Sequence, residues 1–217
     1  MKYVNIHLHP PLFDTDDVIS IPDISSSDIS VSHSTLYSSF GIHPWFLTEE
    51  NATLQFQRLE SLLQNDAIIA IGEVGLDAIR DANMSLQLLV FKQIISLSEH
   101  YKKPLIIHCV KAYEKLLYFH KRRNVKQPWI IHGFHGNIEL VKQLVKRNLF
   151  LSFGSKLLQD SKLHSVFSII PLDSIFLETD NDKINITEIY QVAAEIRNID
   201  VEILKNALYK NFIRVFF

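Results

Sequence analysis

The sequence of 217 residues has no excess of charge of either sign, because 22 Lys and Arg against 24 Asp and Glu give a formal net charge of −2. A protein that coats nucleic acid through its phosphates is normally clearly basic, so any contact with nucleic acid has to come from a local site. Disorder is also excluded, since hydrophobic residues make up 47% and charged residues 21% of the chain.

Long apolar runs and paired cysteines are missing as well. No run approaches the roughly 18 apolar residues that a membrane-spanning helix needs. The opening residues, MKYVNIHLHPP, contain no apolar core of an export signal, and Cys109 is the single cysteine. We therefore expect a cytoplasmic protein without membrane contact, and the length favours a single domain over residues 1–217.

Eight short apolar runs are typical of strands that are buried on both faces. They lie at residues 3–8, 17–21, 39–42, 67–74, 104–108, 128–132, 150–153 and 174–178. Stretches with the apolar spacing of amphipathic helices lie at residues 48–64, 84–101, 112–123, 137–147, 156–168 and 201–215. Thr48 is the expected N-cap of the first of these helices, with Glu49 and Glu50 in its first turn.

Eight strands separated mostly by helices predict a parallel α/β fold, and eight is the strand count of a (β/α)8 barrel. No helix fits between His9 and Asp17, and only the serine-rich stretch 20–39 separates the second strand from the third. We therefore expect a short TIM (β/α)8-type barrel with one or two outer helices reduced or missing near the N-terminus. A doubly wound open sheet is the alternative, but the glycine-rich phosphate loops typical of it are absent.

Residues that can bind a metal ion stand at the ends of five of the expected strands. They are His7, His9, Glu73, His108, His132 and Asp180. In a barrel, the carboxyl ends of the strands converge on the mouth, where the chemistry takes place. His7 and His9 are two residues apart on one strand, so their side chains point to the same face with Cα atoms about 6.6 Å apart.

Each of these residues taken alone has a purely structural explanation. A buried histidine at a strand end is usually hydrogen-bonded within the core, and Glu73 or Asp180 could cap a helix or form a salt bridge. Four imidazoles and two carboxylates gathered in an apolar barrel would be costly to bury, however, and divalent cations compensate that cost. A mixed set of histidine and carboxylate ligands is compatible with Zn²⁺, Mg²⁺ or Mn²⁺.

The segments that carry these residues resemble those of the TatD-related metal-dependent hydrolases, a branch of the amidohydrolase superfamily of TIM barrels. In chain order they are NIHLHP, FGIHPW, AIGEVGLD, PLIIHC, IIHGFHG and LETD, with a weaker match at NFIRVF near the C-terminus. The resemblance implies a metal-dependent hydrolase of ester bonds. Family members are described as deoxyribonucleases, in some cases with 3′-to-5′ exonuclease activity.

The resemblance also implies that six residues hold two divalent ions, Mg²⁺, Mn²⁺ or Zn²⁺. The first ion would be bound by His7, His9 and Asp180, the second by His108 and His132, and both by the bridging carboxylate of Glu73. Together the ions would activate a water molecule and neutralise charge on the phosphoryl oxygens. Asp180 would orient or deprotonate that water as the general base.

Four other residues are candidate contacts of the substrate. His43 matches a family position near the substrate phosphate. Lys111 follows a ligand strand and could hold a flanking phosphate, or it could be a solvated lysine at a helix start. Trp45 could stack on a base or pack under the following helix, and His135 could contact the substrate or be an exposed loop residue.

The chain departs from the family pattern at three places near the expected site. Asn5 stands where the family has aspartate, Val110 and Lys111 replace an Arg-Asp pair, and the loop after Asp180 is cut to residues 181–185. Three functions therefore stay open: a nuclease that acts on DNA ends, a hydrolase of a small phosphoester, amide or lactone, and a non-catalytic barrel that keeps its metals for stability. None of them requires a protein partner.

Overall fold

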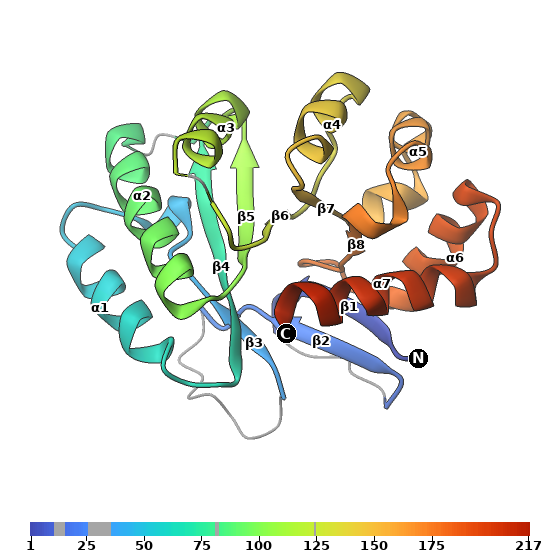
Figure 1. The fold of residues 1–217 in the computed structure, drawn as a ribbon, viewed down its shortest axis with the longest axis horizontal. Coiled ribbons are helices and arrows are strands. Elements are labelled where there is room, and N and C mark those ends of the chain that lie inside the picture. Colours follow the sequence, from blue (N-terminus) through green and yellow to red (C-terminus); the bar gives the residue numbers. More distant parts are fainter. Residues whose placement is uncertain (11–15, 26–35, 81–82, 124) are drawn as a thin grey trace. The chain divides into compact units, whose positions relative to one another are not determined.

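The computed structural model describes residues 1–10, 16–25, 36–80, 83–123 and 125–217 of the chain (Figure 1). These residues form two compact units. Unit 1 contains Met1–Pro22 and Ile130–Phe217, and unit 2 contains Asp23–Trp129. That both belong to one domain, and that the protein is cytoplasmic, stay predictions. Among the described residues, no helix has the length and apolar character needed to cross a membrane.

Unit 1 contains two sets of parallel strands. In the first, β1 (Tyr3–Leu8) pairs with β2 (Val18–Pro22). In the second, β7 (Phe150–Phe153) pairs with β8 (Ile175–Leu177) on one side and with β6 (Trp129–Ile131), which starts at the unit boundary, on the other. Most residues of these strands are buried, as the continuous apolar runs predict.

The end of β1 is joined to the segment that follows β8. The backbone N–H of Asp180 donates to the carbonyl of His7 at 3.0 Å, and the N–H of His9 donates to the carbonyl of Asp180 at 3.1 Å. This short parallel bridge places the Asp180 side chain next to the two histidines of β1.

Four helices of unit 1 each begin at an Asn or Asp whose side chain accepts a backbone N–H of the first turn. They are α4 (Ile138–Val145), α5 (Ser161–Ser168), α6 (Ile186–Arg197) and α7 (Val201–Phe216), capped by Asn137, Asp160, Asn185 and Asp200. Two short 3₁₀ helices, η2 (Ser155–Leu158) and η3 (Leu172–Ser174), precede α5 and β8. Figure 1 shows α6 and α7 lying beside β1, where Tyr190 of α6 hydrogen-bonds both the N–H and the carbonyl of Val4.

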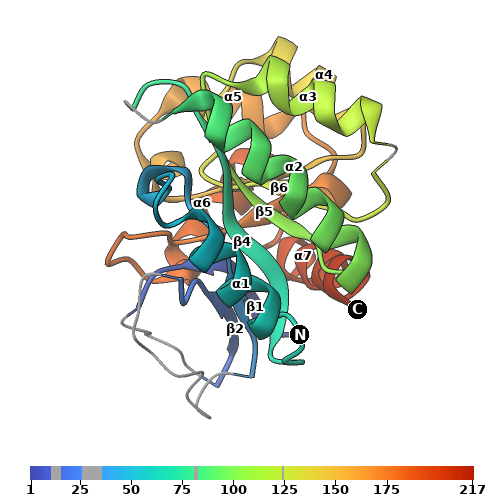
Figure 2. The same ribbon diagram turned by 90° about the vertical axis from the view of Figure 1, so that its left-hand side faces the viewer.

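Unit 2 is built on three parallel strands that pair in chain order. They are β3 (Ser38–Phe40), β4 (Ile68–Asp77) and β5 (Leu105–Val110). A short 3₁₀ helix, η1 (Pro44–Phe46), follows β3, and three α-helices complete the unit: α1 (Ala52–Leu62), α2 (Met84–Tyr101) and α3 (Tyr113–Arg122). All ten residues of β4 are buried, and α2 runs alongside this strand (Figure 2).

The predicted elements agree with the structure except at three helices. The first helix begins at Ala52 and not near Thr48, because Thr48 and Asn51 bond each other's backbone N–H and form a separate turn before it. The expected helix 156–168 is divided by Asp160 into η2 and α5. Helix α6 was not expected at all. No described residue between β1 and β3 is helical, although residues 11–15 and residues 26–35 of the serine-rich stretch lie outside the described residues.

Candidate metal-binding clusters

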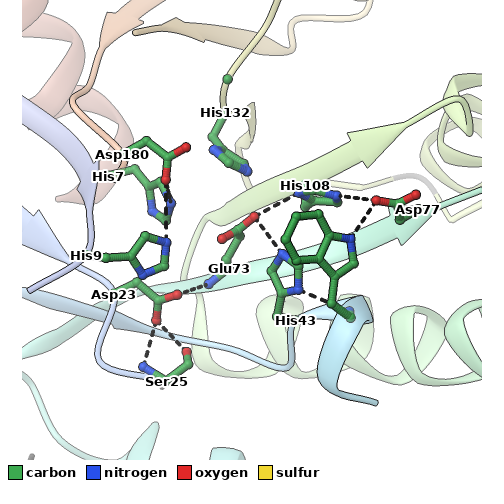
Figure 3. A network of polar contacts seen from close by, with 12 residues as sticks. His7, His9, Asp23, Ser25, His43, Glu73, Asp77, His108, His132 and Asp180 are labelled. Carbon is green, nitrogen blue, oxygen red and sulfur yellow. Dashed lines mark hydrogen bonds and ion pairs between the residues drawn. The ribbon is translucent and has the colours of Figure 1, made fainter. Parts of the chain in front are cut away.

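Three predicted ligands come together in unit 1, and we call His7, His9 and Asp180 the β1 cluster (Figure 3). Each offers one ligand atom, and these atoms lie within 4.8 Å of one another. The Nε2 atoms of His7 and His9 are 3.7 Å and 3.5 Å from Asp180 Oδ1. The His7 side chain is fully buried, whereas 37% of the Asp180 side chain is exposed. The cluster is therefore anchored in the core and open to water at its carboxylate.

The Asp180 backbone has φ 51°, in the left-handed region that non-glycine residues adopt only at a cost of about 1–3 kcal/mol. The two hydrogen bonds to the end of β1 hold it there. Backbone pairing therefore fixes the direction of this carboxylate before any ligand binds.

His132, at the end of β6, lies beside the β1 cluster within unit 1. Its ring centroid is 4.6 Å from that of His7, and its Nδ1 is 3.4 Å from Oε1 of Glu178. Glu178 Oε1 also accepts the backbone N–H of Gly133 at 2.6 Å. Burial would raise the pKa of Glu178, but its close contact with the His132 imidazole, together with the charge of His7, brings that pKa below its ordinary value. Glu178 thus orients His132.

A second group of metal-binding side chains lies in unit 2, and we call His43, Glu73 and His108 the β4 cluster. Glu73 Oε1 is 3.0 Å from His43 Nε2 and 2.9 Å from His108 Nδ1 (Figure 3). All three residues are buried. His43 Nδ1 accepts the backbone N–H of Trp45 at 3.1 Å, so its ring proton lies on Nε2 and is donated to Glu73.

Asp77, the last residue of β4, holds the opposite side of the His108 ring. Its Oδ2 accepts from His108 Nε2 at 3.0 Å and from Trp45 Nε1 at 2.7 Å, while its Oδ1 accepts the backbone N–H groups of Ile79 and Arg80. Burial would raise the pKa of Asp77, but the hydrogen bonds from His108, Trp45 and the two backbone groups hold it well below its ordinary value.

The hydrogen bonds around His108 allow a test of whether a cation fits the β4 cluster. When Asp77 accepts the Nε2 proton of a neutral ring, the Nδ1 lone pair points at Glu73 Oε1 only 2.9 Å away. Two lone pairs at that distance require a proton or a metal cation between them. The β1 cluster likewise presents two imidazoles and one carboxylate, which is a suitable donor set for a divalent cation.

Sequence reasoning did not identify Asp77 or Glu178. Asp77 stands on β4 four residues after Glu73, and Glu178 comes directly after β8, two residues before Asp180. The period-2 alternation of a strand places Glu73 and Asp77 on one face, so this signal could have located Asp77.

The remaining predicted contacts of the substrate lie at the surface. Lys111 follows β5 with φ 52°, is exposed, and makes no ion pair within the described ranges. Trp45 is 41% exposed. His135 is exposed and its Nδ1 donates to the carbonyl of Gly133 at 3.0 Å, so the ring is turned back on its own loop. The structure therefore places Trp45 next to the β4 cluster and assigns no contact to Lys111 that a substrate would have to displace.

A cavity of about 480 Å³ opens in unit 1 beside the β1 cluster. Its lining includes His9 and Asp180 together with Asn5, Asn185 and the exposed Lys183. Asn5 also ties β1 to the segment after β8, because its side-chain amide donates to Thr179 Oγ1 at 2.8 Å and accepts the Thr179 N–H at 3.1 Å. The shortened loop 181–185 thus forms one wall of a space large enough for a small ligand.

Parallel strands that carry imidazole and carboxylate side chains at their carboxyl ends define a class, the barrel-type metal-dependent hydrolases. Residues 25–217 match the family model described as TatD related DNase, and the chain belongs to this family. It is therefore a metal-dependent hydrolase.

Known relatives agree with this assignment. The uncharacterized metal-dependent hydrolase YjjV of Escherichia coli K12 is 24% identical over 206 residues, which cover 87% of this chain and 79% of the relative. A protein of Erwinia tasmaniensis named 3′-5′ ssDNA/RNA exonuclease TatD is 24% identical over 155 residues, covering 66% and 57%.

The solved structure of YjjV, a TatD homologue from Escherichia coli, superposes with a TM-score of 0.82 at 21% identity and covers 99% of this chain and 97% of that one. This likeness confirms the predicted α/β fold of the TIM-barrel type. The resemblance noted from the sequence motifs is confirmed as well.

Proposed function

We propose that this hydrolase is a deoxyribonuclease that removes nucleotides from the 3′ end of single-stranded DNA, with one divalent cation held by each cluster. The observation that carries the proposal is the donor set: the β1 cluster brings two imidazoles and one carboxylate within 4.8 Å, and the β4 cluster brings the Nδ1 of His108 to 2.9 Å from the carboxylate of Glu73. The substrate is inferred from the relative named as a single-strand exonuclease.

In this proposal His7, His9 and Asp180 hold the first cation, and Glu73 with His108 Nδ1 holds the second. Bound there, divalent cations such as Mg²⁺, Mn²⁺ or Zn²⁺ would lower the pKa of a water molecule towards about 7 and neutralise charge on the phosphoryl oxygens. The role of His132 as a further ligand and of Glu73 as a bridging carboxylate stay predictions of the family resemblance.

Asp180 acts as the general base in this scheme. Its Oδ1 faces both histidines of the β1 cluster and accepts from Asn181 Nδ2 at 3.1 Å. Because those contacts are on Oδ1, we assign the uptake of the water proton to Oδ2. The partial exposure of the side chain gives that water a path to the carboxylate.

His43 acts as a hydrogen-bond donor and not as a metal ligand. The N–H of Trp45 occupies its Nδ1, so the proton on Nε2 is available to Glu73 or to a phosphoryl oxygen of the substrate. We further propose that Lys111 attracts the flanking phosphate and that Trp45 contacts a base. A contact from His135 stays a prediction.

The cavity beside His9 and Asp180 favours a second candidate function, hydrolysis of a small phosphoester. Its volume of about 480 Å³ is within the usual range for small-molecule sites, and Lys183 would balance the charge of a phosphate there. The two candidates use the same metal ligands, so they differ in substrate and not in chemistry.

The test is hydrolysis of 5′-labelled single-stranded DNA and of p-nitrophenyl phosphate, each with Mg²⁺ or Mn²⁺. We expect 3′-shortened DNA products from the wild-type protein, and their loss in Asp180→Ala. Glu188→Gln is the matched control, since it removes an exposed carboxylate charge from the first turn of α6 and none from the β1 cluster or the cavity. Hydrolysis of the small ester with intact DNA would favour the second candidate, and hydrolysis of neither would support a non-catalytic protein.

A further inference from the structure

An arginine lies over the exposed tryptophan next to the β4 cluster. The guanidinium carbon of Arg80 is 3.8 Å from the centroid of the Trp45 ring, well within the range of a cation–π contact. The same ring packs edge-on at 4.9 Å from His43 and 5.4 Å from His108. The stacked pair therefore stands beside the proposed metal ligands of unit 2, although the proposed chemistry does not use Arg80.

Asp77 holds both members of the pair in place. Trp45 Nε1 donates to its Oδ2 at 2.7 Å, and the backbone N–H groups of Ile79 and Arg80 donate to its Oδ1 at 2.8 Å and 3.2 Å. The Trp45 backbone is fixed a second time by its hydrogen bond to His43. A platform ordered in advance binds a ligand with less loss of conformational entropy.

The pair presents positive charge and an aromatic surface to solvent. Trp45 is 41% and the neighbouring Ile79 is 66% exposed, and Arg80 is exposed as well. Within the described part of the chain Arg80 makes no ion pair, so its charge is not neutralised there by a carboxylate. In a protein of net charge −2, the positive charge of Arg80 over Trp45 favours the approach of an anionic substrate.

The geometry points to Arg80 and Trp45 as the binding site of an unpaired nucleotide, whose base stacks on the guanidinium that lies over the indole. Unpaired bases stack on aromatic rings and on guanidinium planes, and a guanidinium also attracts phosphate. The inference rests on the proposed nuclease function and narrows its substrate to a strand with unpaired bases, in preference to a small ester without a base.

The test measures binding by tryptophan fluorescence, with Mg²⁺-loaded protein and two nuclease-resistant phosphorothioate tetramers: one of thymidine and one of abasic deoxyribose. Quenching reports on Trp45, because the second tryptophan, Trp129, is only 1% exposed. The variants are Arg80→Ala and Arg80→Lys. Arg122→Ala is the matched control. Arg122, the last residue of α3, also lies over an exposed aromatic ring, at 5.3 Å from the centroid of Tyr118, but it makes no contact with the β4 cluster among the described residues.

We expect the wild-type protein to bind the thymidine tetramer at least about tenfold more tightly than the abasic one. Arg80→Ala should remove this preference, and Arg80→Lys should remove most of it because the ammonium keeps the charge but loses the plane. Arg122→Ala should keep it. No preference in the wild-type protein, or the same preference in Arg80→Ala, would overturn the inference.

The labelled-DNA assay separates this inference from the proposed function. DNA cleavage without an Arg80-dependent preference for bases would leave the nuclease in place and remove the nucleotide site. An Arg80-dependent preference in a protein that cleaves no DNA with Mg²⁺ or Mn²⁺ would remove the nuclease and support the nucleotide site.

Discussion

The β1 cluster and the β4 cluster contain the same kinds of side chain but hold them differently. In the β4 cluster, Glu73 lies 2.9 Å and 3.0 Å from its two histidines, and Asp77 and Trp45 fix the far sides of those rings. In the β1 cluster, the imidazole–carboxylate distances are 3.5 Å and 3.7 Å, and backbone bonds set the position of Asp180.

The difference indicates how each cluster would respond to a cation and to mutation. A cation in the β4 cluster has to displace the proton between Glu73 and His108. The hydrogen bond from His108 to Asp77 holds that ring in place, so Asp77 influences the affinity for the cation. A cation in the β1 cluster enters a looser group with an exposed carboxylate, so the ligands themselves matter most. Substitutions of the ligands and of their outer partners therefore distinguish the two clusters.

The largest effect is expected from Glu73→Gln, which removes the anionic centre of the β4 cluster. A neutral amide attracts a cation far less and is a weaker acceptor for the Nε2 proton of His43. We expect DNA hydrolysis to fall at least about 100-fold. The measurement is kcat with saturating Mn²⁺, with Glu139→Gln on the exposed face of α4 as the control. A rate within a few-fold of wild type would show that the β4 cluster is not needed.

Asp77→Asn tests whether the outer partner controls cation affinity. Asparagine keeps the shape but weakens the acceptor that fixes the His108 Nε2 proton. We expect cation affinity to fall about 10- to 100-fold. Calorimetric titration of the metal-free protein with Mn²⁺ measures this. Asp200→Asn, at the N-cap of α7, should change nothing because both residues cap helices well. Equal affinity in Asp77→Asn and wild type would place control of the site elsewhere.

Substitutions of Asn5 show how much its hydrogen bonds to Thr179, which join β1 to the segment that carries Asp180, stabilise the protein. Asn5→Leu leaves the buried Thr179 N–H without its side-chain acceptor, and we expect a loss of about 1–3 kcal/mol in the free energy of unfolding. Asn5→Asp keeps an acceptor for that N–H and should lose less. Urea denaturation of both variants checks the order, and equal losses would show that the hydrogen bond does not matter.

The smallest effect is a pH dependence in the metal-free protein. The pKa of Asp77 is lower in the folded than in the unfolded state. The ionised carboxylate therefore stabilises the fold above the pKa of the unfolded state, and this stabilisation is lost as the pH falls below that pKa. We expect the free energy of unfolding to decrease less in Asp77→Asn than in the wild-type protein as the pH is lowered from about 5 to about 3. Parallel curves for the two proteins would remove Asp77 as a source of the acid sensitivity.

Most strands and helices of the fold could be predicted from the sequence, because buried parallel strands are continuous apolar runs and polar residues stand at their ends. Even α6 had a signal: Asn185 as a cap and apolar residues at 186, 189, 190, 193 and 194. The beginning of α1 could not be placed, because Thr48 is as good a cap in sequence as Asn51 and only the structure shows that they bond each other.

The candidate site was predicted less completely than the fold. Motifs name the ligands, but they do not tell which nitrogen of His43 carries the proton or which group accepts from His108 Nε2. The proton position on His43 depends on the backbone N–H of Trp45, and the partner of His108 Nε2 is Asp77 at the end of another strand. The stacking of Arg80 on Trp45 has the same origin, since the two residues are far apart in the sequence.

The number of bound cations shows whether the β1 and β4 clusters are two separate metal sites. We expect mass spectrometry of protein purified without chelator and dialysed against Mn²⁺ to find two cations per chain. His9→Ala should lose one of them and keep the other, because the β4 cluster contains none of its atoms. A wild-type protein that binds no cation, or a His9→Ala variant that keeps both, would show that the two clusters are not separate metal sites.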